Sequence, residues 1–438
     1  TPVPIIMAST STFDYVIVGA GVFGLTAAIE LKSRQNDARI CVLDPGPVPH
    51  RHAASTDVSK VIRMDYGGDE LYVEMMEESF PIWKRWNDEW KEQVYFESGL
   101  VGVFDSLEAG TFEARTVDTL KKRGHKIETF EKASDFRARF PAWKQDHVGY
   151  FNPVAGWARS GRVVEHLNRI AVAAGINVQY GSMNKLLLKP TASSSNSSPT
   201  SVCEGLVTTD GQELRAKTVI VAAGASTPML IPQVKHLMWP TAQTVFHIEI
   251  EEPSQFPVEQ FPVFFSSIAS TGFYGFPIIE ERLTTKLAPR KDIAPGVKAL
   301  PADPSRPQFR LKIGQHGPGH KLDTITDTSV DNLWSQIEAS EEKKFRSWLN
   351  IALPQLAKSK IVYTRICMYC DTFDGDFLID HVPSVSGLVV ASGGSGHGFK
   401  FTPILGSIIA DVVQKKPNKF KSRFAWRDLS LGRKESSR

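Results

Sequence analysis

The 438-residue sequence has few cysteines and no long apolar run. Its four cysteines, Cys41, Cys203, Cys367 and Cys370, are too sparse for a secreted disulfide framework. We therefore expect a reducing compartment, cytoplasmic or peroxisomal. No stretch reaches the roughly 18 unbroken apolar residues that a membrane-spanning helix requires, so we expect no contact with a membrane.

An excess of charge of one sign is also missing. The sequence has 51 Lys and Arg residues against 48 Asp and Glu residues, which gives a formal net charge of +3. No basic run is interleaved with aromatic residues, and this argues against nucleic acid as a partner. The hydrophobic content of 42% and the charged content of 23% are ordinary for a globular protein, and the length predicts two domains.

Residues 13–44 have the pattern of a β-α-β unit. The apolar strand FDYVIV at residues 13–18 precedes a glycine turn, the helical pattern GLTAAIELKSR and a second strand, RICVL, at residues 39–43. Two later strands, at residues 218–222 and 387–391, also lead into glycine. These segments predict an α/β fold with one discontinuous nucleotide-binding domain, whose insertions form a substrate domain.

The glycine turn carries the strongest motif in the sequence. Gly19 permits a tight turn, Gly21 leaves room for a pyrophosphate to approach, and Gly24 lets helix and strand pack closely. Asp44 ends the second strand, where its carboxylate can accept hydrogen bonds from an adenosine ribose. This pattern predicts dinucleotide binding; the alternative is a glycine-rich turn in an ordinary doubly wound sheet. The N-terminal position of the motif and the two later strands favour FAD over NAD.

Three motifs nearer the C-terminus carry a family resemblance. They are RICMYCDT at residues 365–372, FLID at 377–380 and GGSGHGFKF at 393–401. In this order behind the dinucleotide motif, they resemble the monomeric sarcosine oxidase family of flavin amine oxidases. That family includes pipecolate oxidases, fungal saccharopine oxidases and fructosyl amine oxidases. The resemblance covers about residues 13–412, with looser matches at 85–150 and 240–300.

The resemblance implies a glutathione-reductase-like architecture, in which a discontinuous, Rossmann-like FAD-binding domain carries an inserted α+β substrate domain. It also implies a monomer whose partners are a small amino-acid substrate and oxygen. With the strand pattern, we expect an FAD-binding domain at residues 12–84, 151–235 and 361–415, a substrate domain at residues 85–150 and 236–360, and a C-terminal tail at residues 416–438.

The resemblance assigns Cys367 to a thioether with the flavin. From the residues alone, Cys367 and Cys370 could instead form a redox pair or half of a zinc site. The sequence has no second cysteine pair, and the flanking residues IVYTRICMY have the pattern of a strand rather than of the start of a helix. We therefore predict FAD bound covalently through Cys367, no metal, and a packing role for Cys370.

Two residues in the segment 309–316 match active-site positions of the family. Lys312 matches the lysine that activates oxygen, because a fixed cation stabilises superoxide as the first electron leaves the reduced flavin. The alternative is a solvated lysine on an edge strand. His316 matches an active-site histidine of the sarcosine oxidases, where fructosyl amine oxidases tend to carry an acid. A lone histidine is otherwise more often structural.

Arg63 and Lys400 match the pair of cations with which the family binds a carboxylate, which a guanidinium grips with two hydrogen bonds. Taken singly, each cation could be an ordinary surface residue. Lys60 stands where sarcosine oxidases have a second arginine. We assign it to cofactor binding together with Lys400 and Gly396, and we expect Tyr66 to line the substrate pocket.

These residues predict an FAD-dependent oxidase of the secondary amine of a small N-substituted amino acid, such as pipecolate, saccharopine or sarcosine. The products are an imine, which is then hydrolysed, and hydrogen peroxide. The combination of Arg63 and His316 favours the pipecolate and saccharopine branch. The alternatives are a fructosyl amino acid oxidase, a biosynthetic N-methyl amino acid oxidase, and a flavin-binding scaffold without turnover.

Overall fold

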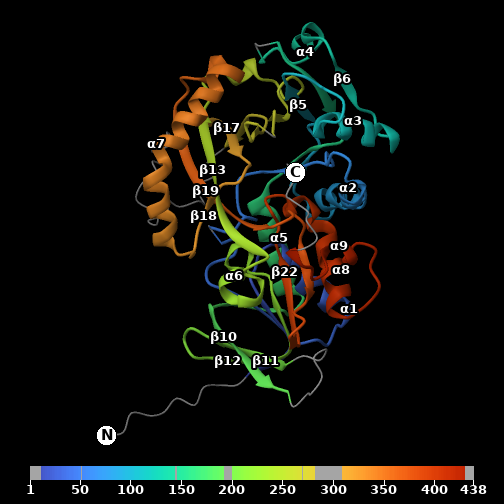
Figure 1. Ribbon diagram of the computed structural model, residues 1–438, viewed down its shortest axis with the longest axis vertical. Coiled ribbons are helices and arrows are strands. Elements are labelled where there is room, and N and C mark those ends of the chain that lie inside the picture. Colours follow the sequence, from blue (N-terminus) through green and yellow to red (C-terminus); the bar gives the residue numbers. More distant parts are fainter. Residues whose placement is uncertain are drawn as a thin grey trace.

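Two large sheets organise the chain. The computed structural model describes residues 11–50, 52–143, 146–191, 200–268, 270–281 and 308–429. In Figure 1 the sheet that contains the N-terminal β-α-β unit (the first sheet) lies in the lower half of the molecule, and the second sheet lies in the upper half. Among the described residues, no helix combines the length and the apolarity needed to cross a membrane.

The first sheet is built around the predicted β-α-β unit. β1 (Ser11–Val18) lies between β2 (Ile40–Asp44) and β12 (Glu213–Val221), and the three strands are parallel. β9 (Asn177–Tyr180) extends the sheet beyond β2, and β22 (Leu388–Ser392) pairs with β12. β2 and β22 are buried along their whole length, as expected for parallel strands covered on both faces. The other strands of this sheet are β10 (Met183–Pro190), β11 (Ser201–Thr208), β20 (Leu378–His381) and β21 (Val385–Ser386).

Three helices pack beside the first sheet. α1 (Val22–Arg34) contacts both α5 (Ser160–Ala173) and α8 (Thr402–Val413), and each of the three also contacts a strand of the sheet. In α8, all residues except Pro403, Ser407 and Asp411 are buried. A helix that is apolar around most of its circumference must be covered on several sides, which agrees with its position between α1 and α2 (Glu70–Trp90).

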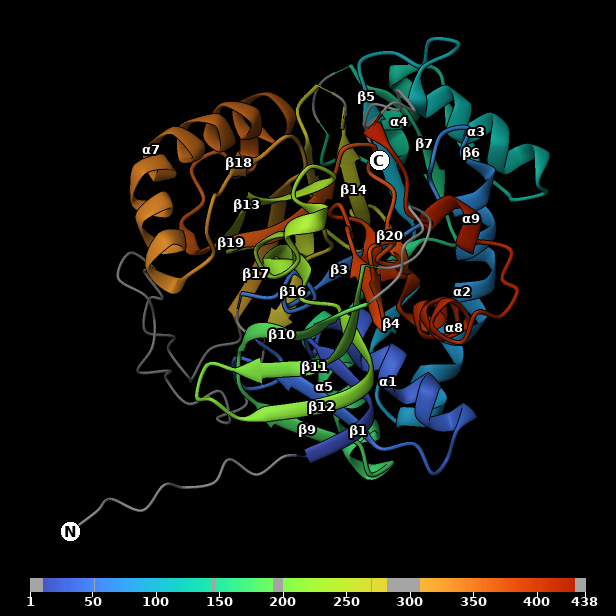
Figure 2. The same ribbon diagram turned by 60° about the horizontal axis from the view of Figure 1, so that its bottom comes forward.

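The second sheet centres on a long antiparallel ribbon. β13 (Met238–Glu249) pairs with β19 (Ile361–Thr372) on one side and with β17 (Gln308–Gln315) on the other. Figure 1 and Figure 2 both place α7 (Asp327–Ala352) against this sheet and away from β10, β11 and β12. Phe345 of α7 stacks on Phe246 of β13, with ring centroids 4.4 Å apart. The other strands and helices of this half are β5 (Leu100–Phe104), β6 (Glu128–Phe130), β7 (Val148–Asn152), β14 (Val263–Ser266), β15 (Phe273–Gly275), β16 (Ile279–Glu281), β18 (His320–Lys321), α3 (Phe112–Lys122) and α4 (Ala133–Arg139).

A small third sheet brings distant segments together. β3 (Lys60–Ile62) and β4 (Tyr95–Phe96) both pair with β8 (Gly156–Ala158). β3 also contacts the short helix η5 (Gly398–Phe401), which precedes α8. The segment that contains Lys60 therefore lies beside the last of the three family motifs.

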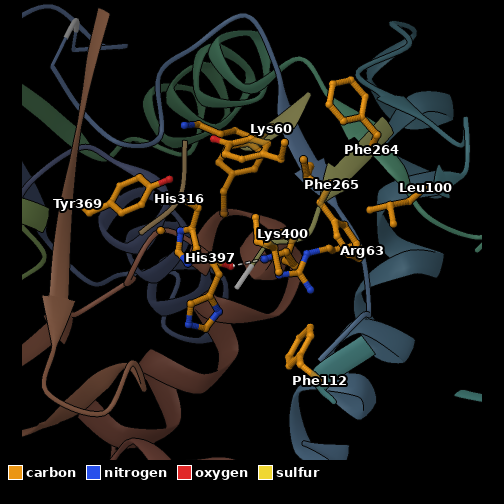
Figure 3. Close-up of a pocket in the computed structure, with 15 residues that line it drawn as sticks. Lys60, Arg63, Leu100, Phe112, Phe264, Phe265, His316, Tyr369, His397 and Lys400 are labelled. Carbon is orange, nitrogen blue, oxygen red and sulfur yellow. Dashed lines mark hydrogen bonds between the residues drawn. The ribbon is translucent and has the colours of Figure 1, made fainter. Parts of the chain in front are cut away.

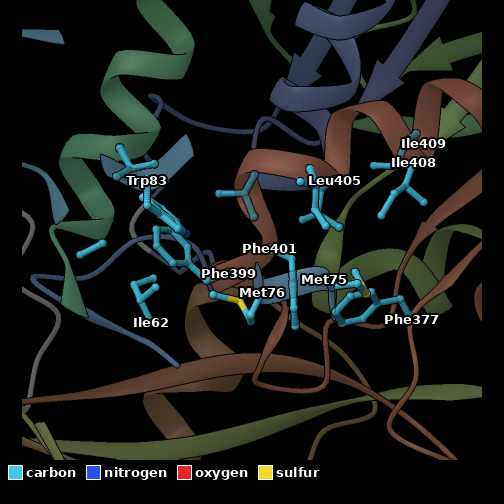
Figure 4. Packing of buried hydrophobic residues seen from close by; sticks show 14 of the residues in the cluster. Ile62, Met75, Met76, Trp83, Phe377, Phe399, Phe401, Leu405, Ile408 and Ile409 are labelled. Atoms are coloured by element: carbon cyan, nitrogen blue, oxygen red, sulfur yellow. The ribbon is translucent and has the colours of Figure 1, made fainter. Parts of the chain in front are cut away.

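Aromatic packing holds η5 in place. Figure 4 shows Trp83 of α2 facing Phe399 of η5, and their ring centroids are 5.9 Å apart. The indole N–H of Trp83 also donates to the carbonyl of Lys400 at 2.8 Å. Trp83 thus fixes the backbone that carries Lys400 through two contacts, one ring contact and one hydrogen bond.

The C-terminal segment is anchored by ion pairs as far as it is described. Arg427 pairs with Asp374 at 2.7 Å, and Arg423, in α9 (Lys421–Phe424), pairs with Asp69 at the same distance. The expected C-terminal tail therefore packs on the protein up to residue 429, and residues 430–438 lie outside the described residues.

The predicted α/β fold and its β-α-β unit are confirmed. β11 and β12 pair in antiparallel fashion. β19 begins the third segment that we assigned to the FAD-binding domain, yet it hydrogen-bonds to β13 of the second sheet. The division into two domains remains our proposal, with β19 as the strand that both domains share.

Gly24 provides a test of the packing of α1 against the turn before it. A Cβ atom at Gly24 would lie 1.9 Å from the carbonyl oxygen of Gly19, so alanine there forces the backbone to move. We expect Gly24→Ala to lower the free energy of unfolding by about 1–3 kcal/mol, although alanine favours helices. The measurement is denaturant unfolding of the purified protein.

Gly68→Ala is the matched control. Gly68 is exposed, and its nearest neighbour would be 3.9 Å from an added Cβ. We expect this substitution to change the free energy of unfolding by about 0.5 kcal/mol or less. Equal losses in the two variants would contradict the packing described for α1.

Candidate active site

The glycine turn between β1 and α1 leaves its backbone accessible. Gly19 has a φ angle of 107°, and an added Cβ would lie 2.4 Å from the carbonyl oxygen of Ala222. Gly21 is the N-cap of α1 and makes no side-chain capping bond of its own. The amide of Val22 donates to the hydroxyl of Ser55 at 3.2 Å. A helix N-terminus with this open approach is suited to a phosphate group.

Asp44 stands at the end of β2 beside this turn. Its Oδ2 accepts a hydrogen bond from the amide of Ala20 at 2.7 Å, and its Oδ1 accepts one from the amide of Gly46 at 3.3 Å. Burial raises the pKa of Asp44 above its usual value. These bonds hold the carboxylate at the mouth of the turn, in the position predicted for a ribose contact.

A long cavity extends from this turn to β3 and η5. Its lining includes Gly19, Gly21 and Asp44, and also Lys60 and Gly396. Gly396 has a φ angle of 71°, and an added Cβ would lie 2.2 Å from the ring of Tyr369. Six of the eight residues that we singled out for the cofactor line this cavity or the neighbouring one, and Cys367 and Gly24 do not. The six are Gly19, Gly21, Asp44, Lys60, Gly396 and Lys400.

A second, short cavity meets the long one. The residues that line both are Lys60, Tyr369, Gly396 and Phe399. Figure 3 shows Lys60, Arg63 and Lys400 around this short cavity, with the aromatic side chains on its other sides. Among its described lining residues there is no Asp or Glu. The other lining residues are Val61, Leu100, Phe112, Phe264, Phe265, Ile268, Tyr274, His316 and His397.

Lys400 is buried and held by hydrogen bonds. Its Nζ donates to the hydroxyl of Tyr66 and to the carbonyl of His397, both at 2.9 Å. The Tyr66 hydroxyl in turn lies 3.0 Å from Nδ1 of His397. Burial, reinforced by the nearby Arg63, holds the pKa of Lys400 well below its usual value. Tyr66 is thus a support behind Lys400 rather than one of the residues that line the short cavity.

Arg63 reaches the short cavity from the segment after β3. Its Nη1 donates to the carbonyl of Asp65, and its guanidinium lies 5.0 Å from the centre of the Tyr66 ring. Asp65 itself is buried and accepts hydrogen bonds from Tyr150 at 2.8 Å and from Asn152 at 3.1 Å. The guanidinium is therefore held at the cavity that it lines.

His316 follows β17 and borders the short cavity. Burial, together with the nearby cations Arg63 and Lys400, lowers the pKa of His316 to about 4. The imidazole is therefore neutral near neutral pH. One ring nitrogen can then accept a hydrogen bond while the other donates one.

Cys367 lies on β19 next to the junction of the two cavities. Its Sγ is 3.4 Å from Nζ of Lys60, and the residue is 1% exposed. Cys370 is three positions away on the same strand, and its thiol instead contacts Ser392 and Met238 at 3.6 and 3.5 Å. Burial raises the pKa of Cys370 to about 12, which suits an inert packed thiol.

Lys312 is not exposed in either cavity. It lies 2.7 Å from a carboxylate oxygen of Asp57, and both side chains are 2% exposed. Burial lowers the pKa of Lys312 to about 8, while Asp57 acts in the opposite direction. Lys60 and Arg365 also lie near Asp57, so Lys312 belongs to a buried charge cluster beside Cys367.

Sequence reasoning missed four residues of this site: Asp57, Tyr274, Tyr369 and His397. His397 and Tyr369 lie inside the motifs already quoted, and their positions there were the available signal. Asp57 is an acid three positions before Lys60, a spacing that alone indicates little. Tyr274 carries no pattern in the sequence, and only the pairing of β15 with β17 brings it to the cavity.

Comparisons with known proteins agree with this geometry. The FAD dependent oxidoreductase family matches residues 14–412. The chain is 25% identical to L-saccharopine oxidase of Schizosaccharomyces pombe, over 94% of this chain and 93% of the relative. It is 24% identical to a monomeric sarcosine oxidase of a Bacillus species, over 92% of each. Its structure superposes on fructosamine oxidase (Amadoriase II) of Aspergillus fumigatus with a TM-score of 0.70 at 26% identity, over 97% of this chain and 94% of that one.

The match spans nearly the whole chain and includes the glycine turn, β19 and η5. The predicted dependence on FAD is therefore confirmed at the level of the family. This chain belongs to the family of FAD-dependent oxidoreductases.

Proposed function

We propose that this protein is an FAD-dependent oxidase that acts on the secondary amine of a small N-substituted amino acid. The products are an imine, which water hydrolyses, and hydrogen peroxide. The observation that carries the proposal is the short cavity, where Lys60, Arg63 and Lys400 face a space whose described lining has no acid. Lys60 lies 3.9 Å from a carboxylate oxygen of Asp57. A buried cation costs several kcal/mol in desolvation unless a counter-ion accompanies it, and for Arg63 and Lys400 a substrate carboxylate supplies that counter-ion.

The fit of FAD to the long cavity rests on its own residues. Gly19 and Gly21 leave the turn open for the pyrophosphate, Asp44 offers a carboxylate to the ribose, and Lys60 and Gly396 border the other part of the cavity. When bound, FAD supplies the redox chemistry, since it takes two electrons from the substrate and passes them to oxygen.

Arg63 and Lys400 bind and orient the substrate. The guanidinium of Arg63 can form two hydrogen bonds to a carboxylate, and the Lys400 ammonium adds a third. His316 is neutral near neutral pH, so one of its ring nitrogens can accept a hydrogen bond from the amine. Holding the amino acid by its carboxylate at one fixed position accounts for part of the rate acceleration, because the reacting C–H bond is then already oriented.

The apolar side of the short cavity indicates that the part of the substrate beyond its carboxylate and amine is apolar. Leu100, Phe264, Phe265 and Ile268 lie on that side and offer no hydrogen-bonding side chain. A sugar hydroxyl or a second carboxylate placed against them would lose its hydrogen bonds to water. We therefore favour a cyclic or N-methylated amino acid with an apolar body over a fructosyl amino acid, although a fructosamine oxidase shares the fold.

Cys367 would carry the covalent bond to the flavin, as the family resemblance implies. The competing redox pair and zinc site are disfavoured by the position of Cys370, whose thiol contacts Ser392 and Met238. The described residues also contain no group of three metal-ligating side chains close enough to hold an ion. Lys60 lies 3.4 Å from the Cys367 sulfur.

We propose that the protein acts as a monomer on its amino acid and oxygen, as the family resemblance implies. All four cysteines are free and buried. This supports the reducing compartment expected from the sequence, cytoplasmic or peroxisomal.

A substrate panel tests the proposed function. Under nitrogen, we expect pipecolate or an N-methyl amino acid with an apolar side chain to bleach the flavin absorbance faster than fructosyl valine or saccharopine. The reason is the apolar wall together with the cations that bind one carboxylate. If no amine bleaches the flavin, the protein is a scaffold without turnover. If fructosyl valine is fastest, the fructosyl alternative is correct.

Arg63→Met tests carboxylate binding. Losing a charge-assisted hydrogen bond costs about 1.5–3 kcal/mol, so we expect the apparent affinity for the substrate in anaerobic flavin reduction to fall roughly 10- to 100-fold. The affinity for the corresponding amino-acid amide should change much less. Arg115→Met serves as the control, because Arg115 is exposed and donates to the carbonyl of Gly110 at 2.9 Å. Equal losses for acid and amide would reject the role of Arg63.

Cys367→Ser tests the covalent link. We expect the wild-type protein to stay yellow after acid precipitation and washing, and the Cys367→Ser protein to release its flavin into the supernatant. Cys370→Ser is the matched control and should retain the flavin, since its thiol lies beside Ser392 and Met238. Release of the flavin by the wild type would refute the link.

A further inference from the structure

Asp57 is a buried carboxylate among three cations that come from three different strands. Its oxygens lie 2.7 Å from Lys312 of β17, 3.6 Å from Arg365 of β19 and 3.9 Å from Lys60 of β3. The Asp57 side chain is 2% exposed. Two backbone bonds strengthen the same junction, because Lys312 donates to the carbonyl of Ser59 and Arg365 to the carbonyl of Thr56.

The charges of this cluster do not cancel. Three cations surround one carboxylate, and like charges at these distances repel one another strongly when they are buried. Asp57 alone among the four attracts the other three. Without it, Lys312, Lys60 and Arg365 would be driven apart, and a buried ammonium would favour its neutral form.

The cluster lies directly behind the junction of the two cavities. Lys60 lines both cavities and contacts the Cys367 sulfur at 3.4 Å. Lys312 lies 4.6 Å from the centre of the Phe276 ring, which leaves its ammonium little freedom besides the bonds to Asp57 and Ser59. The position of both lysines thus depends on one carboxylate.

We infer that Asp57 is a positioning residue of the oxidase, which holds Lys312 and Lys60 beside Cys367, behind the junction of the two cavities, and keeps Lys312 charged for the reaction with oxygen. This inference rests on the proposed function and adds a residue to it. Asp57 does not touch the substrate. It acts through the two lysines, as a fixed counter-ion that preorganises a cationic site.

The rate of the reaction with oxygen should depend on pH through the charge of Lys312. Burial lowers the pKa of Lys312 to about 8, and Asp57 keeps it from falling further. A reaction that needs the charged ammonium is fast below this pKa and is lost as the pH rises through it. Removing Asp57 lowers the pKa of Lys312, so the loss should begin at lower pH. The other charged or titratable groups around this cluster are Lys60 of β3, His247 of β13, Tyr274 of β15, Arg310 of β17, and Tyr363, Arg365 and Cys367 of β19.

Asp57→Asn tests the inference with the flavin-loaded enzyme. The flavin is reduced with dithionite, and its reoxidation by oxygen is followed by stopped flow across the neutral and alkaline range. We expect the midpoint of the oxygen reaction to move to lower pH by about one to three units, since an opposite charge at this distance shifts a pKa by that much. Anaerobic reduction by the amine should slow much less than reoxidation at neutral pH.

Glu341→Gln is the matched control. Glu341 is also 2% exposed and pairs with Lys344 at 2.6 Å, but it lies on α7. We expect it to lower the melting temperature while leaving the pH midpoint of reoxidation at the wild-type value. A wild-type midpoint and rate in Asp57→Asn would overturn the inference, as would equal slowing of reduction and reoxidation.

Two further measurements keep the test decisive. The fraction of flavin retained after acid precipitation should fall in Asp57→Asn, because Lys60 is no longer held beside Cys367. If Asp57→Asn does not fold with flavin, Asp57→Glu is the variant to measure. It keeps the negative charge but displaces it, so we expect reoxidation to slow while its pH midpoint stays at the wild-type value. A wild-type rate there overturns the inference.

Because dithionite reduces the flavin without substrate, failure of every amine to reduce the flavin would reject the proposed function alone.

Discussion

The contact between Lys60 and Cys367 joins segments that lie 307 positions apart in the chain. Lys60 begins β3, next to the β-α-β unit of the first sheet, and Cys367 lies on β19 of the second sheet. The long cavity and the short cavity meet at Lys60, so a cofactor in one can face a substrate in the other only while this contact holds. Asp57 secures it, because its carboxylate attracts Lys60 and Arg365 from the two sides of the junction.

Around this junction, the chain buries more positive than negative charge. Lys60, Lys312, Arg365 and Lys400 are largely withdrawn from water, and Asp57 is the acid closest to three of them. Such an arrangement costs stability in the free protein. It becomes favourable when anions enter, and both an amino-acid carboxylate and an electron-rich reduced flavin qualify. Because the cations around the junction outnumber the acids, the site is suited to anionic ligands that supply negative charge.

The sequence predicted the parts of the site that depend on neighbours along the chain. Gly19, Gly21 and Asp44 sit in one β-α-β unit, so strand, turn and helix could be placed from local patterns. The family motifs predicted Cys367 and Lys400 for the same reason. The ion pair of Lys312 with Asp57 joins β17 to the segment before β3, and no local sequence pattern indicates it. The same holds for Tyr66, whose hydrogen bond to Lys400 depends on the packing of α2 against η5.

The two sheets supply different parts of the site. This separation explains how relatives that are about one quarter identical can share this architecture. The first sheet supplies the glycine turn and Asp44, which we propose hold the cofactor. The apolar wall comes from β5 and β14 of the second sheet, with Leu100, Phe264 and Phe265. Phe264 packs on Trp143 with ring centroids 5.1 Å apart, so the wall is rigid behind its surface. Changes in the side chains that line the cavity can therefore alter which amine fits without disturbing the glycine turn.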